Sequence, residues 1–173
     1  MHLAFCKKEI KLNVIMNLLL NGAIASFVFA PLAKIALIGN GDTFANTIAF
    51  DLGLGTFLVA FFVCFFTMFN IEKAMKKNSL TGLTWDNGSF DKQLTNLLPQ
   101  GKLKTTMVSL IFAFGLFYLP TVFVVHYGME GTMSGMAYTI YKTLYFTVLA
   151  FLLAYAASRN AVTDKNTLQA ATA

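Results

Sequence analysis

Charged residues are scarce in this chain of 173 residues: Asp, Glu, Lys and Arg together make up 12% of it, against 57% hydrophobic residues. The mean hydropathy is +0.64. Soluble domains typically carry about 25% charged residues. The shortage of charge therefore excludes an ordinary soluble domain and indicates a membrane protein.

Cysteine and histidine are also rare. Cys6 and Cys64 are predicted to lie far apart, so we expect no disulfide between them. His2 and His126 are predicted to lie at opposite faces of the membrane, which argues against a bis-histidine haem or a histidine-rich metal site. The sequence also contains no phosphate-binding loop, zinc motif, nucleophile elbow or Cys-X-X-Cys motif. We expect no enzyme activity, no metal and no cofactor.

Four apolar stretches are long enough to cross a hydrocarbon layer, which takes about 20 mostly apolar residues. They lie near residues 14–33, 44–69, 106–125 and 136–157. A long loop, 70–104, separates the second stretch from the third, and no low-complexity linker or repeat divides the chain. The sequence predicts one all-α domain, 1–173, built as a bundle of four transmembrane helices.

Most basic residues fall in segments that share one side of this bundle. These are Lys7, Lys8, Lys11, Lys73, Lys76, Lys77, Lys92, Lys102, Lys104, Arg159 and Lys165. The two loops on the other side hold Lys34 alone, beside Asp42 and Glu130. The positive-inside rule then predicts a multi-pass protein of the cell membrane with both termini in the cytoplasm. The net charge of +5 is expected to meet anionic headgroups of the lipid bilayer, and no nucleic acid is expected as a partner.

Small residues gather on one face of the second stretch when it is drawn as a helix. They are Ala49, Gly53, Thr56, Ala60, Cys64 and Thr67. Small side chains let membrane helices approach closely, so this face is predicted to pack against other helices. The opposite face, with Leu54, Leu58, Phe62, Phe65 and Phe69, is expected to face lipid, and Asp51 lies on it.

Local signals mark the long loop and the third stretch. Asn87-Gly88 predicts a turn, and the nearby Trp85 is expected at the membrane interface, beside a short helix lying on the membrane. Pro120 removes one backbone donor from the third stretch, which predicts a kink there.

Three asparagines, Asn13, Asn17 and Asn21, follow one another every four residues in the first stretch. At this spacing they form a continuous polar strip on one side of a helix. Two interpretations stay open: the amides hydrogen-bond to other helices and hold them together, or they line a passage that opens to the cytoplasm.

Two ionisable residues, Asp51 and Lys142, lie inside the predicted spans at similar depth in the outer half of the membrane. Charges within a membrane are costly unless they are paired, hydrated or extended to the surface. A salt bridge or shared hydrated pocket is therefore one interpretation, and extension of each side chain toward the outer surface is the other.

Tyr138, Tyr141 and Tyr145 surround Lys142 on one arc of the fourth stretch. They are expected to offer hydroxyl groups and cation–π contacts at the outer end of the bundle. His126 and Glu130, in the outer loop, are expected above the same site.

The segments "LNVIMNLLLNGAIASF", "LLPQGKLK" and "YKTLYFTVLA" carry a resemblance that covers most of the chain in outline. In them the chain resembles small uncharacterised bacterial four-helix membrane proteins, some of which are labelled permease-like. The resemblance implies a four-helix membrane fold, and it transfers no functional residue.

Two hypotheses for the function follow. The first is a small transport or channel-like protein that acts as a homo-oligomer, because four short helices rarely enclose a path for a solute alone. The second is a non-catalytic accessory or assembly subunit of a larger membrane complex, which would explain Asp51 on an otherwise lipid-like face. A polar cluster that points inward favours the first, and one that points outward favours the second.

Overall fold

The computed structural model describes residues 1–38 and 47–164, which form a helical bundle with one very short sheet. Long helices make up the bundle, and their bounds are α1 His2–Val28, α2 Ile48–Lys77, α4 Lys102–Ala113, η2 Phe114–Tyr118, α5 Leu119–Gly128 and α6 Gly135–Val162. A short helix, α3 Phe90–Leu97, and the paired strands β1 Ile35–Ala36 and β2 Thr132–Met133 complete the described elements.

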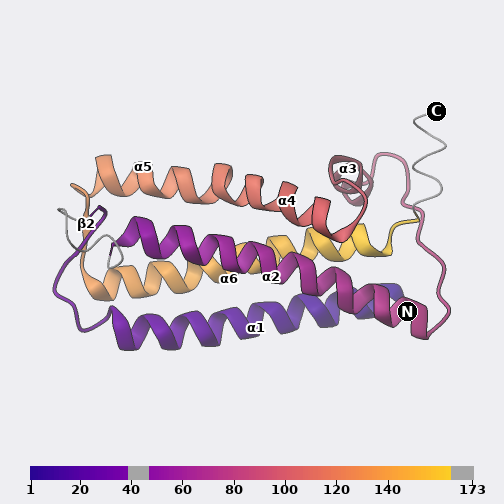
Figure 1. Cartoon of the computed structure of the whole chain (residues 1–173), viewed down its shortest axis with the longest axis horizontal. Helices are drawn as coiled ribbons and strands as arrows, with labels where there is room; N and C mark the ends of the chain where they lie inside the picture. The colour runs from indigo at the N-terminus through magenta and orange to yellow at the C-terminus, as the bar shows by residue number, and fades with distance from the viewer. Residues whose placement is uncertain (39–46, 165–173) are drawn as a thin grey trace.

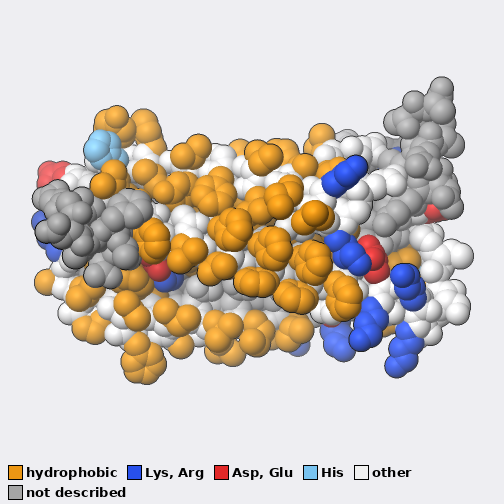
Figure 2. Space-filling model, viewed as in Figure 1, with side chains coloured by type: hydrophobic (Ala, Val, Ile, Leu, Met, Phe, Trp, Pro, Cys, Tyr) orange, Lys and Arg blue, Asp and Glu red, His pale blue; other side chains and the backbone are white. Residues whose placement is uncertain are grey.

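Among residues 1–38 and 47–164, four helices are long and apolar enough to cross a membrane, where α4, η2 and α5 count as one continuous helix. The prediction of an all-α chain with four such helices is thus confirmed. Basic side chains gather at one end of the molecule, and hydrophobic side chains cover its middle (Figure 2). A band of this kind is what a lipid-facing surface requires.

The predicted bounds need correction because the helices are longer than their apolar parts. α1 begins at His2, and it ends at Val28 rather than at residue 33. α2 runs on to Lys77, so the first eight residues of the predicted loop 70–104 are helical. Polar residues extend these helices beyond their apolar stretches, and hydropathy alone does not detect such extensions. The start of the second stretch, 44–46, lies outside the described residues.

The order of the helices in space is set by α2 and α6, which lie together in the bundle (Figure 1). α1 packs mainly against α6, while α2 packs against both α6 and α4. Successive long helices run in opposite directions, so α2 and α6 are parallel to each other. We call the end at which α2 and α6 begin the Asp51 end, and the opposite end the Arg159 end.

Backbone contacts tie the loops together at the Asp51 end. Ile35 pairs with Met133 in the antiparallel pair β1–β2. The amide of Gly135 donates to the carbonyl of Leu32 at 3.0 Å. Thr47 caps α2 through the amide of Phe50. The first two contacts join the segment after α1 to the start of α6, and the cap fixes the first turn of α2.

The helix that contains Pro120 has an irregular turn at the expected place. Residues Phe114–Tyr118 form the π-helical segment η2, in which the amide of Leu119 donates to the carbonyl of Phe114. Pro120 then stands in the first turn of α5, where its missing N–H costs little. A π-helical turn is thus how this helix accommodates its proline.

The small face of α2 lies inside the bundle. Ala49, Thr56, Ala60, Cys64 and Thr67 are all buried. Gly53 is half-buried beside the ring of Tyr118. Small side chains at these positions bring α2 close to its neighbours.

On the opposite face of α2, Leu54, Leu58, Phe62 and Phe69 are exposed and Phe65 is half-buried.

The long loop contains the short helix that its sequence predicts, with a turn at Asn87-Gly88 before it. Trp85 does more than mark an interface, because its Nε1 donates to Thr163 Oγ1 at 2.9 Å. The loop is therefore packed onto the last residues of α6.

Candidate functional site: an ion pair between α2 and α6

Asp51 and Lys142 meet at the Asp51 end of the bundle. Lys142 Nζ lies 2.7 Å from Asp51 Oδ2 and donates to Oδ1 at 2.8 Å. Asp51 is in the first turn of α2, where the positive end of the helix dipole favours a carboxylate. The structure thus answers the question that the sequence left open: the two side chains pair.

The lysine is enclosed more completely than the aspartate. Lys142 is 4% exposed as a residue, whereas the side chain of Asp51 keeps 23% of its surface exposed. The ammonium also lies 4.7 Å from the centre of the Phe29 ring, a cation–π contact with the end of the first helix. Burial of this charge is compensated by Asp51 and Phe29 together, so extension of Lys142 toward the surface is excluded.

Tyr138 completes the cluster around the carboxylate. Its hydroxyl donates to Asp51 Oδ2 at 2.5 Å, and its ring packs edge-on against Phe29. Tyr138 is fully buried. Asp51 therefore accepts hydrogen bonds from two α6 side chains one turn apart.

The other two tyrosines point to other helices and do not surround Lys142. Tyr141 OH lies 2.6 Å from Thr121 Oγ1 on α5, and Tyr145 OH lies 2.8 Å from Thr56 Oγ1 on α2. The ring contacted by Lys142 is that of Phe29, which sequence reasoning did not single out. Tyr141 and Tyr145 therefore form separate hydrogen bonds from α6 to α5 and to α2, and not one patch around Lys142.

Asp51 faces another helix, although it lies on the side of α2 whose other residues are expected to face lipid. Periodicity places Asp51 opposite the small face of α2, but α2 has neighbours on more than one side. Lys142 and Tyr138 reach it from α6. The carboxylate points inward, into the contact between two helices.

His126 and Glu130 do not join this cluster. His126 is exposed in the last turn of α5, with its ring against Tyr127. Glu130 is exposed in the turn that follows, and within residues 1–38 and 47–164 neither side chain forms an ion pair.

The three asparagines form a half-buried strip with one tie to another helix. Asn13 Nδ2 donates to Thr67 Oγ1 on α2 at 3.1 Å. Asn17 donates to the backbone of Asn13, and Asn21 donates to Asn17 Oδ1, both within α1. The contact of Asn13 is the helix-to-helix hydrogen bond that the first interpretation of the strip requires.

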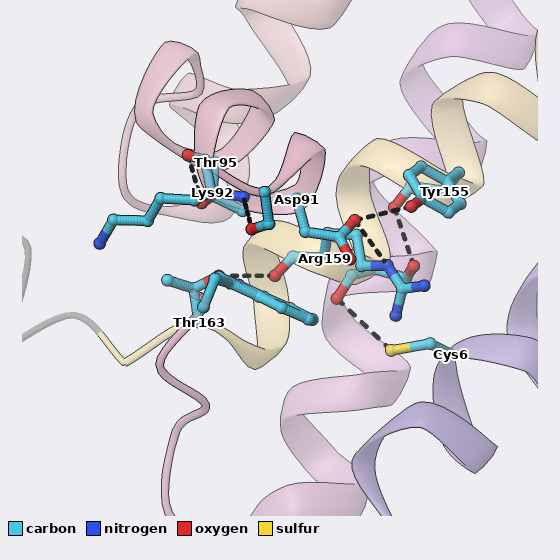
Figure 3. A network of polar contacts seen from close by, with 10 residues as sticks. Cys6, Asp91, Lys92, Thr95, Tyr155, Arg159 and Thr163 are labelled. Carbon is cyan, nitrogen blue, oxygen red and sulfur yellow. Dashed lines mark hydrogen bonds and ion pairs between the residues drawn. The ribbon is translucent and has the colours of Figure 1, made fainter. Parts of the chain in front are cut away.

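A second polar cluster, which sequence reasoning missed, lies at the Arg159 end (Figure 3). Arg159 Nε on α6 lies 3.2 Å from Asp91 Oδ1 on α3, and Tyr155 OH donates to the same oxygen at 2.6 Å. The guanidinium also packs on the rings of Trp85 and Tyr155. In the sequence Arg159 indicates only topology. The signal that could have found the cluster is Asp91, an acidic residue in the first turn of a short amphipathic helix.

No family model, curated protein or solved structure matches this chain. In the described part of the chain, no group of three or more His, Cys, Asp or Glu side chains could hold a metal ion. The geometry of the Asp51–Lys142–Tyr138 cluster is therefore the main basis for an inference about function.

Proposed function

We propose that this chain is a multi-pass protein of the cell membrane, with both termini in the cytoplasm, that acts in transport as a homo-oligomer. The observation that carries the proposal is the inward-pointing ion pair of Asp51 and Lys142 between two apolar helices. Ionisable residues at membrane depth are expensive, and those that pair inside a bundle are characteristic of ion and proton pathways.

The pair has the properties of a site that exchanges a cation or a proton. A proton or small cation that binds Asp51 competes directly with Lys142 for the same carboxylate oxygens. Asp51 remains partly exposed, so it is the member of the pair that a solute reaches first. Tyr138 keeps one carboxylate oxygen oriented during such an exchange, because its hydroxyl donates to Oδ2.

Self-association is supported by the packing of the first helix. Of the 27 residues of α1, only Cys6 and Ala25 are fully buried in the single chain. The space between α2 and α6 is closed below the ion pair, because the buried ring of Phe146 on α6 packs directly against Gly55 on α2. A path between copies of the chain is then more consistent with the packing than a path through one copy.

The decisive experiment is a flux assay in liposomes with a charge-balanced variant. A pH-sensitive dye trapped inside reports proton entry under a potential set by a K⁺ gradient and valinomycin. Asp51→Asn combined with Lys142→Met removes both charges and leaves no buried ion alone, so the protein is expected to fold and to lose flux. Glu72→Gln with Lys102→Met is the matched control, since it removes a half-buried ion pair at the Arg159 end.

Equal proton entry with the wild type and the Asp51/Lys142 double variant would remove the pair from the mechanism. Wild-type entry no faster than that of empty liposomes would reject proton transport.

The accessory-subunit hypothesis keeps one supporting observation. Phe57, Phe62 and Phe66 are all about half exposed on α2 and present an aromatic surface to a larger partner. Its other support, an outward-pointing Asp51, is lost. Native mass spectrometry after gentle extraction separates the two hypotheses: a homo-oligomer without companions supports transport, and a fixed stoichiometry with larger subunits supports the accessory role.

A further inference from the structure

An apolar groove of about 450 Å³ opens on the side of the bundle between α4–η2 and α6, with α3 at one end. Its lining is apolar except for Ser109 and Tyr155. The groove lies toward the Arg159 end, away from the Asp51–Lys142 pair.

The groove lies between two hydrogen bonds that join α4–η2–α5 to α6. Asn160 on α6 donates to Thr105 Oγ1 at 2.8 Å near the Arg159 end. Tyr141 and Thr121 form the other tie, with 2.6 Å between their hydroxyl oxygens. Between these ties, Leu149 and Ala156 on α6 face the gap.

We propose that this groove binds one acyl chain of an anionic phospholipid from the leaflet at the Arg159 end. Leu149 and Ala156 are seven residues apart, which is about 10 Å along a helix. One leaflet contributes about 15 Å of hydrocarbon. The groove thus has the depth of an acyl chain that descends from the headgroup region toward the middle of the membrane.

The helix α3 lies where the headgroup of such a lipid would be. Its apolar residues Phe90, Leu94 and Leu97 line the groove, and the chain around them is polar. Asp91, next to Phe90 on α3, is held by Arg159 and Tyr155. These contacts hold α3 against α6 (Figure 3). Tyr155 itself lines the groove, so the apolar residues of α3 are kept beside it.

The charge at this end favours an anionic headgroup. Arg159 is one turn beyond Tyr155 on α6. Its Nε is paired with Asp91, whereas its buried Nη1 has no hydrogen-bond acceptor among the described residues. Lys92 on α3 forms no ion pair within the described ranges. Basic side chains also crowd this end of the molecule (Figure 2). Each basic residue near a membrane surface adds about 1 kcal/mol of attraction to anionic lipid.

The test is native mass spectrometry of the whole chain released from bilayers of equal parts phosphatidylglycerol and phosphatidylcholine. The wild type is expected to retain one phosphatidylglycerol per chain. Leu152→Trp fills the groove and is expected to abolish retention. Val148→Trp is the matched control, since Val148 is similarly exposed one turn away on α6 but does not line the groove. Ala156→Phe is a second filling variant in case the first fails to fold.

A charge variant tests the headgroup separately. Lys92→Gln is expected to lower the preference for phosphatidylglycerol about fivefold, whereas Lys8→Gln, on α1 at the same end, is expected to leave it unchanged.

Retention that survives both groove-filling variants would overturn the acyl-chain site. Equal retention of the two lipids by the wild type would overturn the anionic headgroup. A second copy of the chain bound in place of lipid, and lost in Leu152→Trp, would make the groove a protein interface and reject the proposal. The readout requires insertion in a membrane but no transport activity, so its failure and the failure of the transport proposal are distinguishable.

Discussion

Asp51 on α2 and Lys142 on α6 form an ion pair with 2.7 Å between Oδ2 and Nζ, and the lysine is almost completely enclosed. Removing one partner of a buried pair leaves an uncompensated charge, which typically costs about 3 to 5 kcal/mol. We expect Asp51→Asn alone to lower the free energy of unfolding by about 3 kcal/mol. Adding Lys142→Met should recover most of that loss.

Unfolding by sodium dodecyl sulfate in mixed micelles measures these differences. If the losses in free energy of unfolding caused by Asp51→Asn and by Lys142→Met simply add in the double variant, the two charges are not directly coupled.

The depth of Asp51 and Lys142 could be predicted from the sequence, because both residues interrupt apolar runs at countable positions. Their pairing could not, because periodicity within one helix does not say on which side a second helix packs. Drawn alone, α2 has one small face and one lipid-like face. In the bundle, α6 reaches around to Asp51 through the long side chains of Lys142 and Tyr138.

The cluster at the Arg159 end shows a related limit. Arg159 and Asp91 are 68 positions apart, and each has an ordinary local explanation, one as a topology signal and one as a residue in the first turn of a helix. Only the packing of α3 on α6 brings them together. A count of charges therefore does not reveal that a short amphipathic helix in a loop packs on one of the long helices.

Gly135 is where the first residues of α6 approach the end of α1 most closely. A Cβ at this position would lie against the carbonyl oxygens of Phe29 and Leu32, which are backbone atoms that cannot rotate away. Gly135→Ala is expected to destabilise the fold by about 1 to 3 kcal/mol, the usual cost of overpacking. Because the first turn of α6 would move away from Phe29, the contact of Lys142 with that ring should weaken as well.

Gly115→Ala is the control for this effect, because a Cβ on Gly115 meets nothing within 4 Å. Its expected effect is neutral to stabilising by up to about 1 kcal/mol. The same loss of stability in both variants would show that glycine flexibility, and not the close approach of α6 to α1, sets the effect.

The asparagine strip separates into one residue that ties helices together and two that do not. Asn13→Ala removes the hydrogen bond to Thr67 on α2 and is expected to cost about 0.6 to 2 kcal/mol. Asn21→Ala removes only a contact with Asn17 in the same helix, so its expected cost is below about 0.5 kcal/mol. Detergent unfolding curves of the two variants, recorded side by side, measure the difference. If Asn21→Ala is stable but lowers flux in liposomes, the strip lines a passage and the first interpretation is incomplete.

The orientation of the bundle can be tested with two exposed lysines at opposite ends. Lys34 follows α1 at the Asp51 end, and Lys77 is the last residue of α2 at the Arg159 end. Cys6 and Cys64 are buried, so a membrane-impermeant maleimide should not react with them in the folded protein. In intact cells we expect the reagent to label Lys34→Cys and to label Lys77→Cys only after permeabilisation, because the positive-inside rule predicts that the Arg159 end is in the cytoplasm. The reverse pattern would invert the topology, and it would place the apolar groove between α4–η2 and α6 in the outer leaflet. Labelling of both variants in intact cells would contradict a bundle that crosses the membrane.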